Sequence, residues 1–119
     1  MFFYFLEEEL LINLKLYNMN FQEVYNEAMK QGREYAIKTQ GENFMIYPCG
    51  FAWVKFDGRS PFGKWLIENN IARKDYPSGV SIWISGYNQS MYHKETHAIA
   101  MVVYLQSQGI KCSAHSRLG

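Results

Sequence analysis

The chain has 119 residues, of which 48% are hydrophobic and 17% aromatic, which predicts a single domain with one core. A formal net charge of +1 excludes a strong overall positive field, so we do not expect a protein that holds a nucleic-acid duplex mainly through its phosphates. Cys49 and Cys112 are too few for a disulfide framework and no secretory signal precedes them, which indicates a reducing cytoplasm.

The first eighteen residues differ from the rest of the chain. Apolar runs at 2–6 and 10–16 are separated by three consecutive glutamates at 7–9, and neither run reaches the ~18 residues of a membrane span. We therefore expect no membrane association. A helix start follows directly, so we interpret residues 1–18 as an N-terminal extension and residues 19–119 as one α/β domain. An extra edge strand at residues 11–16 is the alternative.

Asn20 followed by Glu23 is a capping-box pattern, and an apolar stripe from Phe21 to Ala36 predicts an amphipathic helix of about 18 residues. Gln40 and Gly41 end it. Residues 44–47 then read as a short strand that forms a hairpin with the strand at 49–56. Ser60 and Pro61 predict the start of a second, short helix that ends near residues 69–70.

The alternation of apolar with polar or aromatic residues predicts a strand at 80–85 and another at 110–115. A third helix is expected between them, from Ser90 to a stop at Gly109. Its segment 98–105 is apolar all round, so we expect it to be buried on more than one side. Residues 72–79 read as a surface loop. The element order predicts an α+β fold, a two-layer sandwich in which about three helices pack on one face of a small mixed sheet.

The strand at 49–56 has two unlike faces. Ala52, Val54 and Phe56 form an ordinary core face, whereas the other face carries two aromatic rings and a cation, a combination that suits stacking on unpaired bases. The neighbouring strands add Trp83 and His115 to that face. The predicted residues for binding single-stranded nucleic acid or a partner are Phe51, Trp53, Lys55, Trp83, Lys111 and Arg117.

So many exposed rings would leave an apolar patch that monomers rarely tolerate. We expect a ligand, a second copy of the chain or residues 1–18 to cover it. A plainer alternative is that a helix or residues 1–18 pack there as a second core. Another is a protein-interaction module, such as an inhibitor of a host or anti-phage defence factor, which the near-neutral charge favours.

Residues 49–56 also resemble the central strand signature of RNA-recognition-motif domains. Gly50, Phe51, Ala52, Val54 and Phe56 fit that signature, Trp53 replaces a Phe, and Cys49 stands where a phosphate-binding Lys or Arg is expected. The resemblance implies stacking on bases and leaves a backbone contact at position 49 unsupported.

A wider resemblance runs from about Phe44 to Leu118. It is carried by Cys-Gly-Phe-Ala-Trp-Val at 49–54, by Trp83 with Ser-Gly-Tyr-Asn-Gln-Ser at 85–90, and by Gly-Ile at 109–110 with Ser-Arg-Leu-Gly at 116–119. Here the chain is similar to a family of small uncharacterised bacteriophage proteins. The resemblance implies a phage or prophage origin and brings no activity with it.

Catalytic and metal chemistry find little support in the sequence. His93 and His97 have the i, i+4 spacing of a zinc pair, but Cys112 and His115 fall on opposite strand faces, so we predict helix-surface histidines, no metal and no cofactor. Cys49 has no histidine placed beside it, so we name no catalytic residue and do not expect an enzyme. Asn88, Gln89 and Ser90 could bind a small anion at a helix start, or could simply cap the helix.

Overall fold

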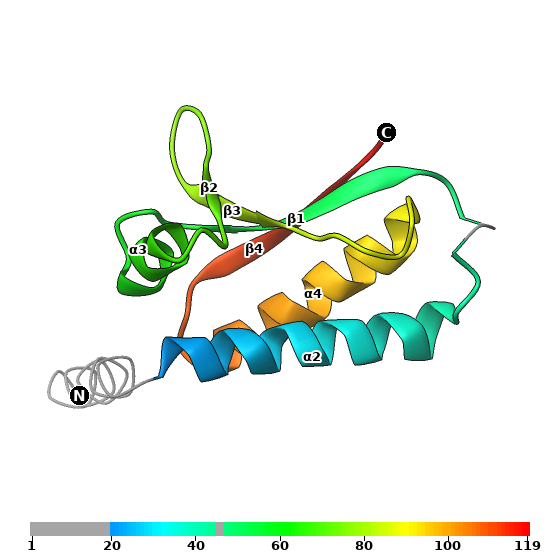
Figure 1. The fold of residues 1–119 in the computed structure, drawn as a ribbon, viewed down its shortest axis with the longest axis horizontal. Helices are drawn as coiled ribbons and strands as arrows, with labels where there is room; N and C mark the ends of the chain where they lie inside the picture. The colour runs from blue at the N-terminus through cyan, green and yellow to red at the C-terminus, as the bar shows by residue number, and fades with distance from the viewer. Residues whose placement is uncertain (1–19, 45–46) are drawn as a thin grey trace, which may run out of the picture.

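The computed structural model describes residues 20–44 and 47–119, and within them three helices cover one face of a four-stranded sheet (Figure 1). The predicted α+β class is confirmed. In chain order the elements are α2 (Phe21–Gln40), β1 (Gly50–Phe56), α3 (Pro61–Glu68), β2 (Arg73–Lys74), β3 (Val80–Trp83), α4 (Met91–Ser107) and β4 (Cys112–Leu118). The proposed boundary after residue 18 lies outside the described residues.

The strands are ordered β2-β3-β1-β4, and every neighbouring pair is antiparallel. The sheet is therefore not mixed, because β1 lies between β3 and β4 and runs opposite to both. The expected hairpin between residues 44–47 and β1 is wrong, since β3 and β4 occupy the two edges of β1. Phe44 lies in a helical turn instead, and residues 45–46 are outside the described part of the chain.

All three predicted helix starts are confirmed. The side chains of Asn20, Ser60 and Ser90 each accept a hydrogen bond from the backbone N–H three residues later. These bonds satisfy amides that have no partner inside the helix, and each contributes about 1 kcal/mol to helix stability. The short polar residues therefore determine where the helices begin.

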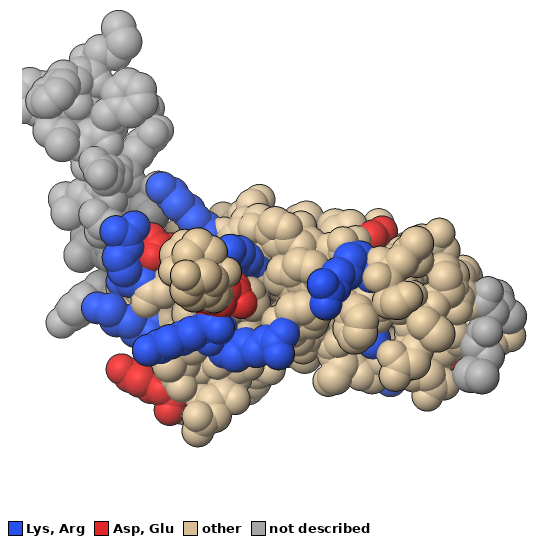
Figure 2. Space-filling model, turned by 90° about the horizontal axis from the view of Figure 1, so that it is seen from above, with Lys and Arg blue, Asp and Glu red and all other residues tan. Residues whose placement is uncertain are grey.

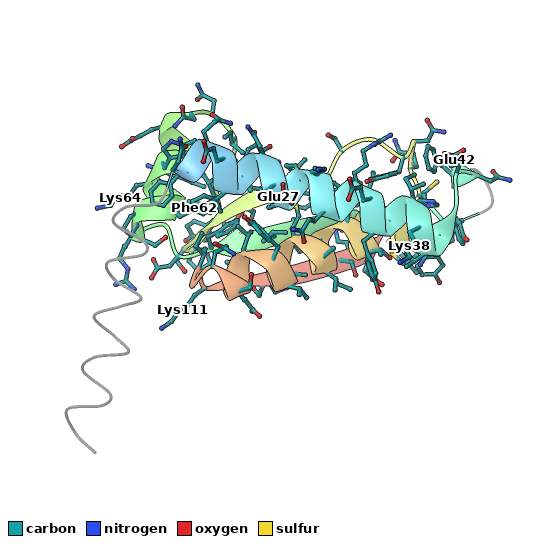
Figure 3. All side chains as sticks on the ribbon, turned by 90° about the horizontal axis from the view of Figure 1, so that it is seen from below. Glu27, Lys38, Glu42, Phe62, Lys64 and Lys111 are labelled. Atoms are coloured by element: carbon teal, nitrogen blue, oxygen red, sulfur yellow. The ribbon has the colours of Figure 1, made fainter. Side chains whose placement is uncertain are left out.

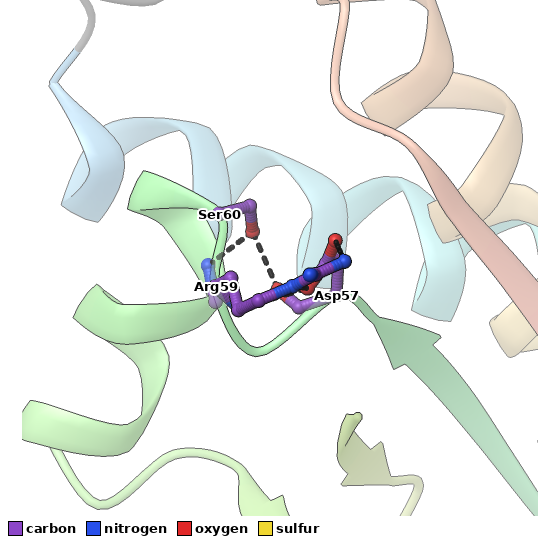
Figure 4. Close-up of polar contacts among 4 residues, drawn as sticks. Asp57, Arg59 and Ser60 are labelled. Carbon is purple, nitrogen blue, oxygen red and sulfur yellow. Dashed lines mark hydrogen bonds and ion pairs between the residues drawn. The ribbon is translucent and has the colours of Figure 1, made fainter. Parts of the chain in front are cut away.

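The turn from β1 into α3 is held by local polar contacts (Figure 4). The Ser60 hydroxyl donates to the Asp57 carbonyl at 2.7 Å and accepts from the Gly63 amide at 3.0 Å. Arg59 pairs with the Asp57 carboxylate at 3.3 Å, which lowers the pKa of Asp57. The ion pair is exposed and screened by water, so the backbone bonds of Ser60 do more to hold the turn.

The core lies between the sheet and helices α2, α3 and α4. Ala52, Val54 and Phe56 of β1 are buried in it, which confirms the predicted core face of this strand. Helices α2 and α4 approach closely at Gly32, where a Cβ atom would lie 2.5 Å from Cδ2 of His97. Only glycine allows that approach without a shift of the helices.

Helix α4 packs against α2 and against strands β1 and β4, so it is buried on more than one side as expected. Its remaining flank is exposed, at 46% for Ile99 and 64% for Val103, so the helix is not buried all round. Two expectations about the strands need correction. The segment expected to be a loop contains the short strand β2, which pairs with β3. Strand β3 ends at Trp83, and β4 continues to Leu118.

Within residues 20–44 and 47–119, no helix combines the length and hydropathy needed to cross a bilayer.

Candidate functional site

The face of the sheet opposite the helices, called here the open face, gathers most of the predicted binding residues. Strand register places Trp53 between Trp83 and His115, and Phe51 opposite Arg117. Lys55 lies between Ser81 and Ser113 in the same way. No other described element lies over this face, so none of the described helices packs there as a second core (Figure 1). The alternative that residues 1–18 cover it lies outside the described residues.

Four side chains, one from each strand, form a continuous stack. We call this stack of Arg73, Trp83, Trp53 and His115 the aromatic row. The guanidinium carbon of Arg73 lies 4.2 Å from the Trp83 ring centroid. The two indoles stack at 4.5 Å with an interplanar angle of 18°, and His115 stacks on Trp53 at 5.7 Å and 14°. Aromatic and cation–π contacts of this kind each contribute about 0.5–1.5 kcal/mol.

The aromatic row leaves no flat face of Trp53 or Trp83 free for a ligand. Both flat faces of Trp53 and of Trp83 are occupied by neighbours in the row, so the expectation that these rings offer free planes to bases is wrong. Alternation correctly predicted the side of the sheet, but ring orientation depends on the partners across the strands. The indole N–H of Trp83 is buried and has no hydrogen-bond partner among the described residues, so stacking sets the position of this ring.

Flat aromatic surface is still available at two places on the open face. Phe51 is 38% exposed and touches only the edge of the row, with a 72° angle to Trp83. His115 ends the row on the edge strand β4, is exposed, and is oriented by a 2.8 Å hydrogen bond between its Nε2 and the Ser113 hydroxyl. Phe51 and His115 are the rings on which a ligand can stack.

Two cations lie beside Phe51. Its centroid lies 5.4 Å from the Arg117 guanidinium and 5.7 Å from the ammonium of Lys94, a buried residue of α4 that donates to the Gly50 carbonyl. Seen from above, Lys and Arg side chains gather around the end of the molecule where β2 lies, with fewer Asp and Glu (Figure 2). The open face is therefore locally basic although the whole chain is nearly neutral.

Lys111 lies outside the strands but close to the same face. Together with Lys55 and Ser113 it lines a hollow of about 550 Å³ between the β1–α3 turn and the β2–β3 loop, where Arg59 and its ion-pair partner Asp57 also lie. The two lysines have no carboxylate within 4.0 Å among the described residues, and with the Ser113 hydroxyl they suit a phosphate group. All six predicted binding residues thus lie on the open face or at its margin.

At the predicted anion site, residues 88–90, the polar groups cap α4 and tie its start to β1. Ser90 is 1% exposed, and its hydroxyl bonds both the backbone amide and Nδ1 of His93. The Gln89 carbonyl accepts from the Gly50 amide at 3.0 Å, which ties the start of α4 to β1. Asn88 is exposed in a left-handed turn with φ of 53°. The Ser90 hydroxyl is thus unavailable to an anion.

The two helix histidines are buried, so their expected surface position is wrong. His93 uses both ring nitrogens, on the Ser90 hydroxyl at 2.6 Å and the Gly41 carbonyl at 2.7 Å. Nδ1 of His97 bonds the Tyr87 hydroxyl at 2.7 Å. Burial and the nearby Arg33 charge lower the pKa of His97 to about 4. Sequence spacing could not reveal this, because the glycine that admits His97 is on another helix.

The described residues contain no group of three or more His, Cys, Asp or Glu side chains placed to hold a metal ion. Cys49 is exposed, whereas burial raises the pKa of the Cys112 thiol to about 12. A thiol with so high a pKa stays protonated near neutral pH and is a poor nucleophile.

Comparisons with protein-family models, with curated proteins and with solved structures found no match for this chain. The two sequence resemblances therefore stay predictions, and the proposed function rests on the geometry of the open face.

The stacked tryptophans should be energetically coupled. In a double-mutant cycle of Trp53→Ala and Trp83→Ala, we expect a coupling free energy of about 0.5–1.5 kcal/mol from urea unfolding. A control cycle of Trp53→Ala with Trp65→Ala, on the other side of the sheet, should be additive within about 0.5 kcal/mol. Additivity in the first cycle would show that the indoles do not stack in solution.

Burial of His97 predicts a pH dependence of folding. Its pKa of about 4 lies below the unfolded value of ~6.5, so the unfolded chain binds more protons between these values. Stability should therefore fall as pH drops from 6.5 to 4, with a contribution approaching ~1.4 kcal/mol per pH unit. His97→Gln should remove that part of the slope in urea titrations, whereas His115→Gln on the exposed edge strand should keep it. Equal slopes for parent and His97→Gln would contradict this assignment.

Proposed function

We propose that the open face binds single-stranded nucleic acid and that the protein is a small, non-catalytic binding module of bacteriophage type. One observation carries the proposal: flat rings at Phe51 and His115 lie on an uncovered sheet face among cations that have no carboxylate partner. Among the described residues, Arg59 and Asp57 are the only oppositely charged pair whose nitrogen and oxygen atoms lie within 4.0 Å. Lys55, Arg73 and Arg117 are thus available for phosphates.

The arrangement suits an unpaired strand better than a duplex. Bases of a single strand can turn outward and stack on Phe51 and His115, while Arg117 and Lys55 meet the backbone. A four-stranded sheet that stacks two or three bases is also how RNA-recognition-motif domains bind, and β1 is an interior strand of such a sheet here. The local resemblance of residues 49–56 to that family supports the same use.

The small number of cations limits the electrostatic share of the affinity. If Lys55, Lys111 and Arg117 each contact one phosphate, the logarithm of the binding constant should fall with the logarithm of salt with a slope of about −2. Stacking must then supply most of the remaining free energy, at ~1–3 kcal/mol for each base. We therefore expect modest affinity that survives moderate salt.

A protein partner is the second candidate. The row occupies the flat faces of both tryptophans, and Tyr76 at the β2–β3 loop is 98% exposed. Ring edges beside an exposed tyrosine suit burial against another protein, including a second copy of this chain. In a bacteriophage, an inhibitor of a host or anti-phage defence factor would use such a face.

Substitutions on the open face should separate stacking from charge. Phe51→Ala should weaken binding of a single-stranded oligonucleotide by ~1–3 kcal/mol in fluorescence anisotropy titrations. Arg117→Gln should instead reduce the salt slope by about 0.7. Tyr35→Ala, an exposed ring of α2 on the helical side, is the matched control and should change neither quantity.

The same titrations decide between the candidates. Single-stranded DNA and RNA should bind better than duplex at low salt. If the parent protein binds no nucleic acid under those conditions while its fold is intact, the nucleic-acid proposal fails and the protein-partner candidate takes its place.

A further inference from the structure

A second hollow lies on the helical side of the molecule, between α2 and the segment that joins β3 to α4. It measures about 880 Å³ and is lined by α2, by Ser85 and Gly86, and by His97 of α4. In the view from below, the β3–α4 segment runs along one side of α2 and α4 along the other (Figure 3). The hollow shares no lining residue with the open face, and its size is in the range of small-molecule sites.

The wall formed by α2 is positively charged. Lys30, Arg33 and Lys38 all line the hollow, with Glu34 as the carboxylate among its lining residues. None of the three cations has a carboxylate within 4.0 Å in the part of the chain that is described. Three unneutralised cations against one acid give the hollow a net positive charge, which favours an anionic ligand.

Arg33 contacts a buried ring. Its guanidinium carbon lies 5.3 Å from the ring centroid of Tyr87, which is 3% exposed. The Tyr87 hydroxyl shares a 2.7 Å hydrogen bond with Nδ1 of His97, so the ring that Arg33 contacts is itself fixed. A guanidinium that rests on a fixed ring loses less freedom when it binds a ligand.

The rest of the lining is largely apolar. Met29 and Ile37 contribute aliphatic surface. His97, 3% exposed, also lines the hollow, and its Nε2 has no hydrogen-bond partner among the described residues. Gly86 has a φ of 88° and only the tip of Arg33 near its absent side chain, so it leaves the entrance open. Aliphatic surface beside a cationic wall suits a molecule with an apolar body and one anionic group.

We propose that this hollow binds a small organic anion, with its carboxylate, sulfonate or phosphate group on Arg33 and its apolar body against Met29 and Ile37. Lys30 and Lys38 add to the positive field at the rim. The site is separate from the open face and does not depend on the function proposed for it.

The probe for this site is 8-anilinonaphthalene-1-sulfonate, which joins an aromatic body to one sulfonate. Fluorescence titration of the full chain should give a single saturable transition, and Arg33→Gln should weaken it about tenfold or more. Arg33→Lys keeps the charge and should lose less. Arg59→Gln, which removes an exposed arginine of the β1–α3 turn, is the matched control and should bind the probe like the parent.

Two further arms locate the binding and identify its chemistry. N-phenyl-1-naphthylamine has the same apolar body without the sulfonate and should bind about tenfold more weakly, and Lys55→Gln should leave sulfonate binding unchanged. Thermal unfolding monitored by circular dichroism checks that each variant is folded. Equal binding by folded Arg33→Gln, equal binding of the uncharged probe, or loss of binding in folded Lys55→Gln would each overturn the proposal.

Discussion

The structure depends on the pairing of β1 along both of its edges. Because β3 and β4 hold this strand in the middle of the sheet, its side chains are forced to alternate between two fixed environments. Ala52, Val54 and Phe56 are buried in the core, where α4 packs against β1 and Phe56 contacts Phe62 of α3, and the residues between them are placed on the open face. The same register brings Trp83 and His115 to either side of Trp53, so the pairing that builds the core also builds the aromatic row.

A second constraint is the close contact of α2 with α4. Gly32 makes room for the His97 ring, His97 bonds Tyr87, and the Tyr87 ring contacts the Arg33 guanidinium. The absence of a side chain at Gly32 thus allows a histidine to be buried beside the hollow on the helical side. The molecule has two basic regions of different kinds: an uncovered sheet face that carries rings and cations, and a hollow where cations of α2 lie beside aliphatic side chains.

Local patterns in the sequence predicted what local physics decides. Cap residues such as Ser60 and Ser90 predicted helix starts because their hydrogen bonds reach only three residues along the chain, and alternation predicted the core face of β1. The incorrect predictions concern contacts between residues that are far apart in the sequence. The false hairpin and the unrecognised β2 depended on strand order, and the burial of His97 depended on Gly32. The orientation of the indoles depended on contacts across all four strands.

The three tryptophans of the chain provide the most direct test of the proposed binding face. Trp53 and Trp83 belong to the aromatic row, whereas Trp65 packs against Phe62 on the helical side of the sheet. We would follow their indole N–H resonances by two-dimensional NMR while adding a single-stranded oligonucleotide at low salt. If the oligonucleotide binds the open face, the signals of Trp53 and Trp83 should shift and saturate together while that of Trp65 stays in place. Binding that leaves Trp53 and Trp83 unchanged, or that moves all three alike, would contradict it.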